Sequence, residues 1–488
     1  MIKKTLILLL ITLLLADIGY SFLQHYHTPF DGDMAGGIVP AEDVKPILES
    51  PFGIKIFTEH TTYPNPNRFF CYWSFYKYFN NVPLFLQNFT SPINSAYLSC
   101  ALAKTIIQVI IIFLLSLFIS GGIFKFDFLV AAIFITPLFQ TNGYRSYMGI
   151  IDPSTTYTFF YALPTIFILI YFAPLFLKHF YGLELKRLKY IKYLWIPIAL
   201  ISSLSGPLNP GISLVVSLLI FTHYFTQNLS NSDNKNVFSR LKYVIQNIPN
   251  DYYYYLIPIS VFSLYSLFLG RFNSIDLSNK MPLSVLYSRL PQGIYYSFTQ
   301  KLGFPILFLI LTINTLIIHY KFRTKEGKKI LNTFKWIGFF ALMYILLLPL
   351  GGYREYRPYV LRYDTIIPIT LSLMFIFAKT TMFILSKFSN RNKYWYIPLV
   401  VLVIFVFTNS DEPKFDKNSC ERNAILQIAS STEPIVKIDD NCTVLSWTII
   451  ENPQESELKT KLLKIWRIID DDKLFYQKSP VTNTQYNQ

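Results

Sequence analysis

The sequence has little charge and few cysteines, and the shortage of charge excludes an ordinary soluble domain. Charged residues make up 15% of its 488 residues, against 52% hydrophobic residues. A soluble chain of this length carries more charge and shorter apolar runs. Here apolar runs close to the roughly 20 residues that cross hydrocarbon recur along the chain. Together with 44 Phe and 35 Tyr residues, which suit interfacial aromatic belts, this composition indicates a polytopic membrane protein.

Several signatures of nucleotide and hydrolase chemistry are also missing. The chain has no Walker A sequence, no GxGxxG motif between a strand and a helix, and no HExxH or GxSxG motif. Neither ATP-driven transport nor dinucleotide chemistry is therefore indicated. The four cysteines show no CxxC spacing, which argues against a zinc site. Cys420 and Cys442 both lie in the C-terminal segment, and the sequence leaves a disulfide between them open.

The net charge of +15 at pH 7 would suit a nucleic-acid partner, but the positions of the charges indicate a membrane topology instead. The short polar segments at alternate connections hold 20 Lys or Arg residues and only four acids. This is the positive-inside pattern, in which basic connections lie in the cytoplasm. We therefore expect no nucleic-acid partner. These segments are 1–4, 121–127, 178–192, 227–250, 321–335 and 387–393.

Hydropathy predicts an all-α polytopic membrane protein with about eleven transmembrane helices. The first runs from Leu6 through Tyr20 and is expected to stay uncleaved, because no small-x-small site follows it. The short spans 193–206 and 210–226 could instead be one broken helix, since Pro and Gly join them. Two spans keep every basic connection on one side, so the charge pattern favours two. The later spans are 99–120, 127–141, 154–177, 193–206, 210–226, 253–270, 303–320, 336–350, 361–386 and 394–409.

The same pattern predicts which side of the membrane each part occupies. The N-terminus is expected in the cytoplasm and the C-terminus on the extracytoplasmic side. Residues 31–98 form a long first extracytoplasmic loop, whose amphipathic stretches are typical of interfacial helices. We expect a transmembrane domain over residues 1–410 and a small extracytoplasmic tail over 411–488. That tail buries little core alone, so we expect it to pack on the membrane domain.

Acidic and basic residues gather on the predicted outer side. Asp31 and Asp33 directly follow the first span, where two carboxylates can reach one metal ion or share a proton. A solvated turn that ends the helix is the alternative. In the second outer loop, Arg145 runs against the positive-inside bias, which indicates an anionic partner. Asp152 either caps the helix that starts near residue 154 or takes part in chemistry.

The densest polar cluster precedes the span at 361–386. It contains Arg354, Arg357 and Arg362 together with four tyrosines within eleven residues. The planar guanidinium suits phosphate, so these arginines and Arg145 are the predicted phosphate-binding residues. The alternative is a local pairing of the arginines with nearby acids such as Asp364, which would anchor the helix end.

This layout resembles the GT-C superfamily of membrane glycosyltransferases, which use polyprenyl-phosphate-linked sugar donors. Its members have a cytoplasmic N-terminus and a long first outer loop, with acidic residues at the start of that loop and often in the second. Asp31 and Asp33 match the first position, and Asp152 could match the second. The Arg/Tyr cluster at 354–364 looks like the basic group that such enzymes place against the donor phosphate. The chain lacks the WWD-type signature of oligosaccharyltransferases.

The resemblance implies transfer of a sugar from a lipid-linked donor to an acceptor outside the cytoplasm, in a bacterial inner membrane. Asp31 or Asp33 would act as general base. Alternatively, Asp33 and Asp152 would hold a divalent ion, Mg or Mn, and arginines would stabilise the leaving phosphate. Two other interpretations stay open: a polysaccharide polymerase or ligase of the O-antigen type, and a lipid or glycan flippase or secondary transporter. The sequence indicates neither the sugar, the acceptor nor the oligomeric state.

Overall fold

The computed structural model describes residues 2–183, 192–230, 237–276, 281–351 and 359–477. Within these ranges the chain is mostly helical, and nine helices are long and apolar enough to cross a membrane. Their length and composition indicate an integral membrane protein, as predicted. The helices that form these spans are α1 (Ile2–Tyr26), α6 (Pro92–Ser120), α10 (Leu163–Tyr181), α12 (Asn209–Ser230), α14 (Asn250–Gly270), α16 (Gly303–Lys321), α17 (Lys325–Leu347), α18 (Ile367–Lys387) and α19 (Asn390–Ser410).

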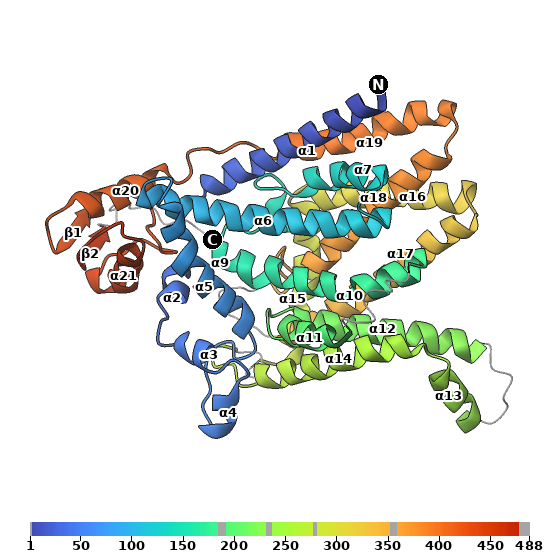
Figure 1. The fold of residues 1–488 in the computed structure, drawn as a ribbon, viewed down its shortest axis with the longest axis horizontal. Coiled ribbons are helices and arrows are strands. Elements are labelled where there is room, and N and C mark those ends of the chain that lie inside the picture. The colour runs from blue at the N-terminus through green and yellow to red at the C-terminus, as the bar shows by residue number, and fades with distance from the viewer. Residues whose placement is uncertain (1, 184–191, 231–236, 277–280, 352–358, 478–488) are drawn as a thin grey trace.

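The spans run side by side, and basic connections gather at one end of the bundle, which we call the basic end (Figure 1). Contacts between the segments hold this end together. Lys329 donates hydrogen bonds to the carbonyls of His179 and Phe180, at 3.1 and 2.6 Å, and Lys387 pairs with Glu326. The start of α1 lies at the same end. The described parts of the basic end are residues 2–5, 121–127, 178–181, 321–335 and 387–393.

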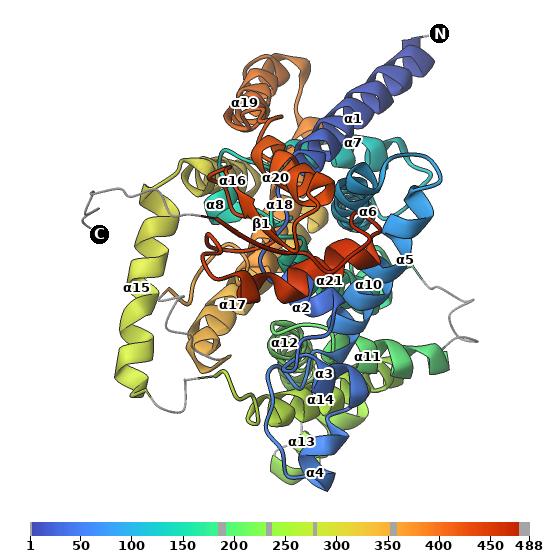
Figure 2. The same cartoon turned by 90° about the vertical axis from the view of Figure 1, so that its left-hand side faces the viewer.

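The opposite end, which we call the capped end, is covered by the long first loop and the C-terminal segment (Figures 1 and 2). The loop is shorter than predicted, because α6 begins at Pro92 and not at residue 99. The hydroxyl of Ser91 accepts the backbone N–H of Asn94 and so caps the helix at this earlier point. The helices of the first loop are α2 (Met34–Ile38), α3 (Lys45–Glu49), α4 (Ile54–Thr58) and α5 (Phe69–Leu86).

Two predicted spans correspond to shorter apolar helices. Residues 127–141 contain α7 (Phe126–Ile135), and 193–206 contain α11 (Trp195–Ser203). The carbonyl of Leu204, just after α11, accepts the N–H of Phe70 from α5, so the chain turns at the capped end before α12 begins. Nine of the eleven predicted spans coincide with long helices among the described residues, and the total of eleven stays a prediction. The remaining helices outside the C-terminal segment are α8 (Arg145–Met148), α9 (Thr155–Tyr157), α13 (Val237–Gln246) and α15 (Leu283–Thr299).

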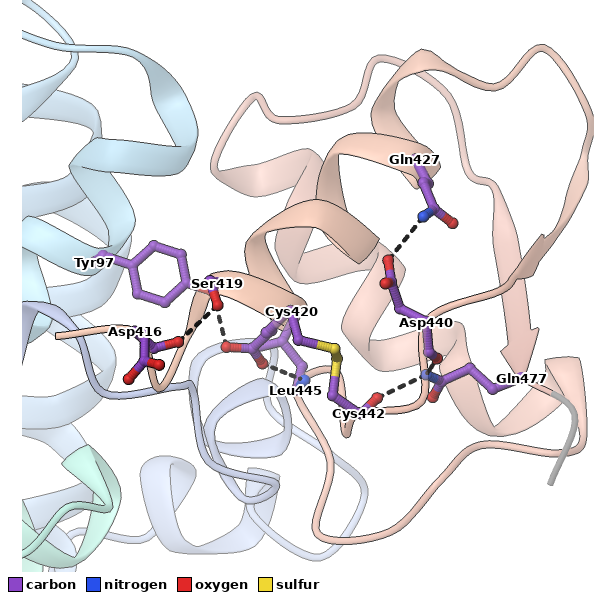
Figure 3. Close-up of a disulfide and its surroundings, with 10 residues drawn as sticks. Tyr97, Asp416, Ser419, Cys420, Gln427, Asp440, Cys442, Leu445 and Gln477 are labelled. Atoms are coloured by element: carbon purple, nitrogen blue, oxygen red, sulfur yellow. Dashed lines mark hydrogen bonds between the residues drawn. A yellow bond between two sulfur atoms is a disulfide. The ribbon is translucent and has the colours of Figure 1, made fainter. Parts of the chain in front are cut away.

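The end of the chain folds into a small compact body over residues 419–477, which we call the C-terminal unit. Its β1 and β2 pair in parallel, with Ile435 opposite Leu474, and form the one sheet among the described residues. A disulfide joins Cys420 to Cys442, which answers the question that the sequence left open (Figure 3). The elements of the unit are α20 (Ser419–Ser430), β1 (Ile435–Ile438), α21 (Glu457–Ile465) and β2 (Leu474–Gln477).

The C-terminal unit and the first loop share a single apolar core. Phe30 and Phe79 from the N-terminal part lie in one buried cluster with Trp466 and Phe475 from the C-terminal unit. The indole N–H of Trp466 also donates to the carbonyl of Phe79 at 3.0 Å. Because neither segment is long enough to bury much apolar surface alone, each completes the core of the other. The capped end is therefore one packed body made from both ends of the sequence.

A buried carboxylate fastens this body to the spans. Glu421 in α20 accepts three hydrogen bonds: from the N–H of Phe30 at 2.8 Å, the hydroxyl of Tyr97 at 2.8 Å and the N–H of Leu445 at 3.0 Å. Burial raises the pKa of Glu421 to about 7, although these hydrogen bonds act in the opposite direction. Glu421 therefore connects the C-terminal unit to α6 and to the turn after α1.

Replacing Glu421 by Ala should loosen the capped end. The substitution leaves the buried N–H groups of Phe30 and Leu445 without acceptors, and each such group costs roughly 1–3 kcal/mol. We expect a clearly lower melting temperature for the purified protein in detergent, measured by differential scanning fluorimetry. Glu433→Ala is the matched control, because Glu433 is exposed on the same unit. Equal melting temperatures for the two variants would contradict this role of Glu421.

Candidate functional site

Asp31, the first predicted acidic residue, is buried in the turn between α1 and α2. One of its oxygens accepts the Thr156 hydroxyl at 2.7 Å and the N–H of Asp33 at 3.2 Å. The other accepts the N–H of Thr156 at 3.0 Å. Burial raises the pKa of Asp31 above its usual value, and the bonds from Thr156 oppose that shift. Since both oxygens are occupied, Asp31 holds α9 against the first loop.

Asp33, two residues later, is exposed and has a different environment. Its side chain accepts one hydrogen bond among the described residues, from the indole Nε1 of Trp447 at 3.2 Å. A Cβ at Gly32 would lie 2.5 Å from Cδ1 of Trp447 and 2.6 Å from its backbone nitrogen. Only glycine therefore lets the indole come this close. The carboxylate of Asp33 can therefore still bind a ligand, whereas both oxygens of Asp31 already accept hydrogen bonds.

Asp152 is buried in the loop between α8 and α9. Its oxygens accept the Tyr363 hydroxyl at 2.7 Å and the N–H of Ser154 at 2.8 Å. The capping role is taken by Ser154, whose hydroxyl accepts the N–H of Tyr157, so the capping alternative for Asp152 does not hold. Burial raises the pKa of Asp152, while the bond from Tyr363 and the charge of Arg145 lower it. Ser154 also interacts with Asp31, so the two acidic positions meet at the start of α9.

Lys104 in α6 is a member of the site that was not singled out from the sequence. It is buried, its ammonium donates to the carbonyl of Pro153, and the charges of Asp31 and Asp152 both act on it. A charged residue inside an apolar span is expensive and is expected to be paired. Lys104 is the one charged residue in the predicted span 99–120, and this signal could have identified it from the sequence.

Arg145, at the start of α8, lies over the ring of Tyr363, with 5.1 Å between the guanidinium carbon and the ring centroid. Its Nη1 is buried and has no hydrogen-bond partner within the described part of the chain. A buried, charged N–H group without an acceptor costs free energy. An anion bound beside Asp152 and Tyr363 would supply the missing acceptor, and the anion-binding role of Arg145 stays a prediction.

Of the other predicted phosphate ligands, one is paired with an acid and two lie outside the described residues. Arg362 forms a bidentate pair with Asp364, with Nε to Oδ1 at 2.8 Å and Nη2 to Oδ2 at 3.0 Å. The local pairing considered as the alternative is therefore present, and it occupies part of the Arg362 guanidinium. Arg354 and Arg357 lie outside the described residues. Arg145 is consequently the strongest candidate ligand for an anion.

The predicted metal ligands do not form a ready-made site in the described residues. No group of three or more His, Cys, Asp and Glu side chains there is placed to hold a metal ion. Asp152 has the charges of Lys104 and Arg145 beside it, and these cations oppose the binding of a further cation. Asp33 is the more accessible carboxylate, so a metal role for it stays a prediction.

A largely apolar cavity of about 360 Å³ lies within the bundle. Side chains of α6, α10, α12, α14, α17 and α18 line it, and its volume is typical of small-ligand sites. Pro368, in its wall, lies in the first turn of α18, four residues after Asp364. His179 and His223 line the cavity toward the basic end. The cavity therefore reaches from the first turn of α18 toward the basic end of the bundle.

No protein-family model, curated protein or solved structure matches the chain. The function must therefore be inferred from the chemistry of the site. Hydrogen bonds and charge interactions join Asp31, Ser154 and Asp152 to Tyr363 and Arg145 in one cluster at the capped end. This cluster contains a cation suited to an anion, Arg145, and the accessible carboxylate of Asp33 lies next to it. A separate apolar cavity lies within the bundle.

Replacing Arg145 by Gln should weaken anion binding. A hydrogen bond to a charged group contributes about 1.5–3 kcal/mol, so we expect an affinity for inorganic phosphate about tenfold lower or more. The measurement is a titration of the purified protein followed by ³¹P NMR line broadening. Arg467→Gln, which changes an exposed arginine of the C-terminal unit, is the control. Equal affinities for the two variants would remove Arg145 as an anion ligand.

Proposed function

We propose that the chain is a membrane glycosyltransferase that transfers a sugar from a polyprenyl-phosphate-linked donor to a hydroxyl of an acceptor at the capped end. One observation carries the proposal. A single polar cluster connects Asp33, whose carboxylate is exposed, through Asp31 and Asp152 to Arg145, whose buried Nη1 has no hydrogen-bond partner among the described residues. These are the two charges that such a transfer needs, one to accept a proton and one to stabilise a leaving phosphate.

The acid–base role belongs to Asp33. Its carboxylate takes the proton of the acceptor hydroxyl while the acceptor oxygen forms a bond to the anomeric carbon of the sugar. The bond between that carbon and the phosphate oxygen breaks, and polyprenyl phosphate leaves with the bonding electron pair. Asp31 is a positioning residue, because it holds the turn of Asp33 through the Asp33 N–H and anchors α9 through Thr156.

The leaving phosphate is stabilised by Arg145. The bond from Tyr363 to Asp152 fixes the ring over which the guanidinium lies, so the cation is held in place before the donor binds. Such preorganised charge acts on the transition state without reorganisation. The positive charge of Lys104 offsets the charges of Asp31 and Asp152, which both act on it. Lys104 therefore helps to hold the turn after α1 and the loop before α9 in place.

The apolar cavity suits the isoprenoid part of the donor. Its lining is mostly Leu, Ile, Val and Phe side chains. Burial of each CH₂ group contributes about 0.8 kcal/mol, so a prenyl chain gains affinity along such a wall. With the chain in the cavity, the phosphate would lie near the first turn of α18, on the side of Asp364 and Tyr363.

The charge distribution and the disulfide support one orientation in the membrane. We propose that the basic end faces the cytoplasm, because Lys and Arg are enriched in cytoplasmic connections. The disulfide between Cys420 and Cys442 lies in the C-terminal unit at the opposite end, and disulfides persist in oxidising compartments. The transfer would then occur on the extracytoplasmic face, which for a bacterial chain is the outer face of the inner membrane.

Replacing Asp33 by Asn should abolish sugar transfer while leaving the protein folded. General-base catalysis contributes roughly 10²–10⁴-fold, so we expect turnover to fall at least about a hundredfold. The assay uses the purified protein in proteoliposomes with polyprenyl-phosphate-linked hexoses and N-acetylhexosamines, radiolabelled in the sugar. It follows the release of polyprenyl phosphate together with transfer of label. Asp43→Asn, an exposed site in the same loop, is the control.

The same assay separates the competing functions. A flippase or secondary transporter would move the labelled lipid across the vesicle membrane without release of polyprenyl phosphate, and that result would overturn the proposal. A polymerase or ligase of the O-antigen type would accept diphosphate-linked glycans and not the monophosphate-linked sugars. Undiminished transfer by the Asp33→Asn variant would leave the transferase class intact but would remove Asp33 as the base.

Removal of divalent ions should leave transfer by the purified protein largely unchanged. Arg145 and Lys104 supply positive charge at the site, so the leaving phosphate has cationic groups of the protein beside it. We expect activity within about twofold after EDTA treatment, a change that corresponds to roughly 0.4 kcal/mol or less. Loss of activity that Mg²⁺ or Mn²⁺ restores would show instead that Asp33 works through a bound metal ion.

A further inference from the structure

The loop that carries Trp447 is held rigidly at its base. Leu445, two residues earlier, is fully buried and adopts a positive φ of 48°, which side chains with a Cβ rarely take up. Its N–H donates to Glu421 at 3.0 Å, and the disulfide between Cys420 and Cys442 ties the start of the loop to α20 (Figure 3). Such strain persists only where the surroundings fix it, and it often marks a functional segment.

This rigid loop presents a large aromatic ring to solvent beside Asp33. Trp447 is 53% exposed, although Leu445 at the base of its loop is buried. The indole stacks on Tyr157, with 5.8 Å between ring centroids and an interplanar angle of 18°, and its Nε1 donates to Asp33. Gly32 provides the space for this approach. Residues from three distant parts of the sequence therefore combine to hold one exposed ring in a fixed orientation.

We propose that Trp447, supported by Tyr157, is the acceptor subsite and that it binds a pyranose ring of a carbohydrate acceptor. The face of an aromatic ring carries partial negative charge, which suits the weakly positive C–H groups on one face of a sugar. The adjacent carboxylate of Asp33 accepts hydrogen bonds from sugar hydroxyls, one of which is the reacting group. This inference rests on the proposed transferase function, which leaves the class of acceptor open.

The position of the ring favours the acceptor over the donor. The donor phosphate and prenyl chain are assigned to Arg145 and the apolar cavity, on the side of Asp152 and Tyr363. Trp447 comes from the C-terminal unit, at the outermost part of the capped end (Figure 2). A water-soluble or surface-attached glycan would reach Trp447 from solvent without passing through the bundle.

Direct binding of simple sugars tests the subsite without a donor. Saturation-transfer-difference NMR is recorded on the full-length protein in nanodiscs with methyl glycosides of glucose, galactose, mannose and N-acetylglucosamine. We expect at least one glycoside to bind through the C–H protons of one ring face. An aromatic contact accounts for about threefold to tenfold in affinity, so Trp447→Ala should weaken binding by that factor. Trp447→Phe, which keeps an aromatic ring, should retain most of it.

Matched variants separate a binding role from a structural one. Trp73→Ala is the control, because Trp73 in α5 is 45% exposed and belongs to the first loop of the same capped end. Its binding should equal that of the unaltered protein. Gly32→Ala should weaken binding as Trp447→Ala does, since a Cβ there displaces the indole. Absence of glycoside binding, or equal binding by the Trp447→Ala and Trp73→Ala variants, overturns the subsite.

The transfer assay then distinguishes this inference from the function on which it rests. In that assay Trp447→Ala should raise the KM for the acceptor and change kcat little. Sugar binding that depends on Trp447, without any transfer by the unaltered protein, would support the subsite and contradict the transferase. Transfer that proceeds with the same acceptor KM in the Trp447→Ala variant would contradict the subsite alone.

Discussion

The burial of Lys104 is the constraint on which the arrangement of the site depends. Its ammonium lies inside α6 without exposure to solvent, so it requires anionic or carbonyl oxygens around it. Pro153 supplies a carbonyl, and Asp31 and Asp152 supply charge from two separate loops. Because removal of one member would leave the others buried and unbalanced, this cation holds the turn after α1 and the start of α9 in a fixed relation. The accessible groups, Asp33 and Arg145, lie beside this fixed centre.

A second constraint acts through the C-terminal unit. This unit is too small to form a large core, and it completes the core of the first loop through Trp466 and Phe475. Glu421 adds three buried hydrogen bonds that reach α6 and the turn after α1. The last part of the chain therefore stabilises the same turn that carries Asp33 and also places Trp447 next to it. Folding of the capped end and assembly of the site are one event.

Much of the fold could be predicted from the sequence, because hydropathy and charge bias act locally. Nine predicted spans coincide with long helices, whereas α7 and α11 are shorter than their apolar runs suggested. The acidic pair after the first span and Arg145 all lie at the capped end, and their roles in a site stay predictions. Two features depended on long-range packing and gave no local signal: the different burial of Asp31 and Asp33, and the approach of Trp447 to Gly32. The pairing of Arg362 with Asp364 is local, and the sequence already offered it as an alternative.

The polar side chains of the candidate site lie at one end of the bundle, and the large cavity inside the bundle is largely apolar. This separation favours catalysis over transport. In transporters, substrate and ion sites lie near the middle of the membrane, where discontinuous helices expose polar backbone. In this chain Asp31, Asp33, Asp152, Arg145 and Tyr363 gather at the capped end, and the cavity inside the bundle is largely apolar. An apolar cavity can hold a prenyl chain but offers few partners to a charged sugar phosphate crossing the bundle. The arrangement therefore suits a lipid that stays in place while its head group reacts at one end.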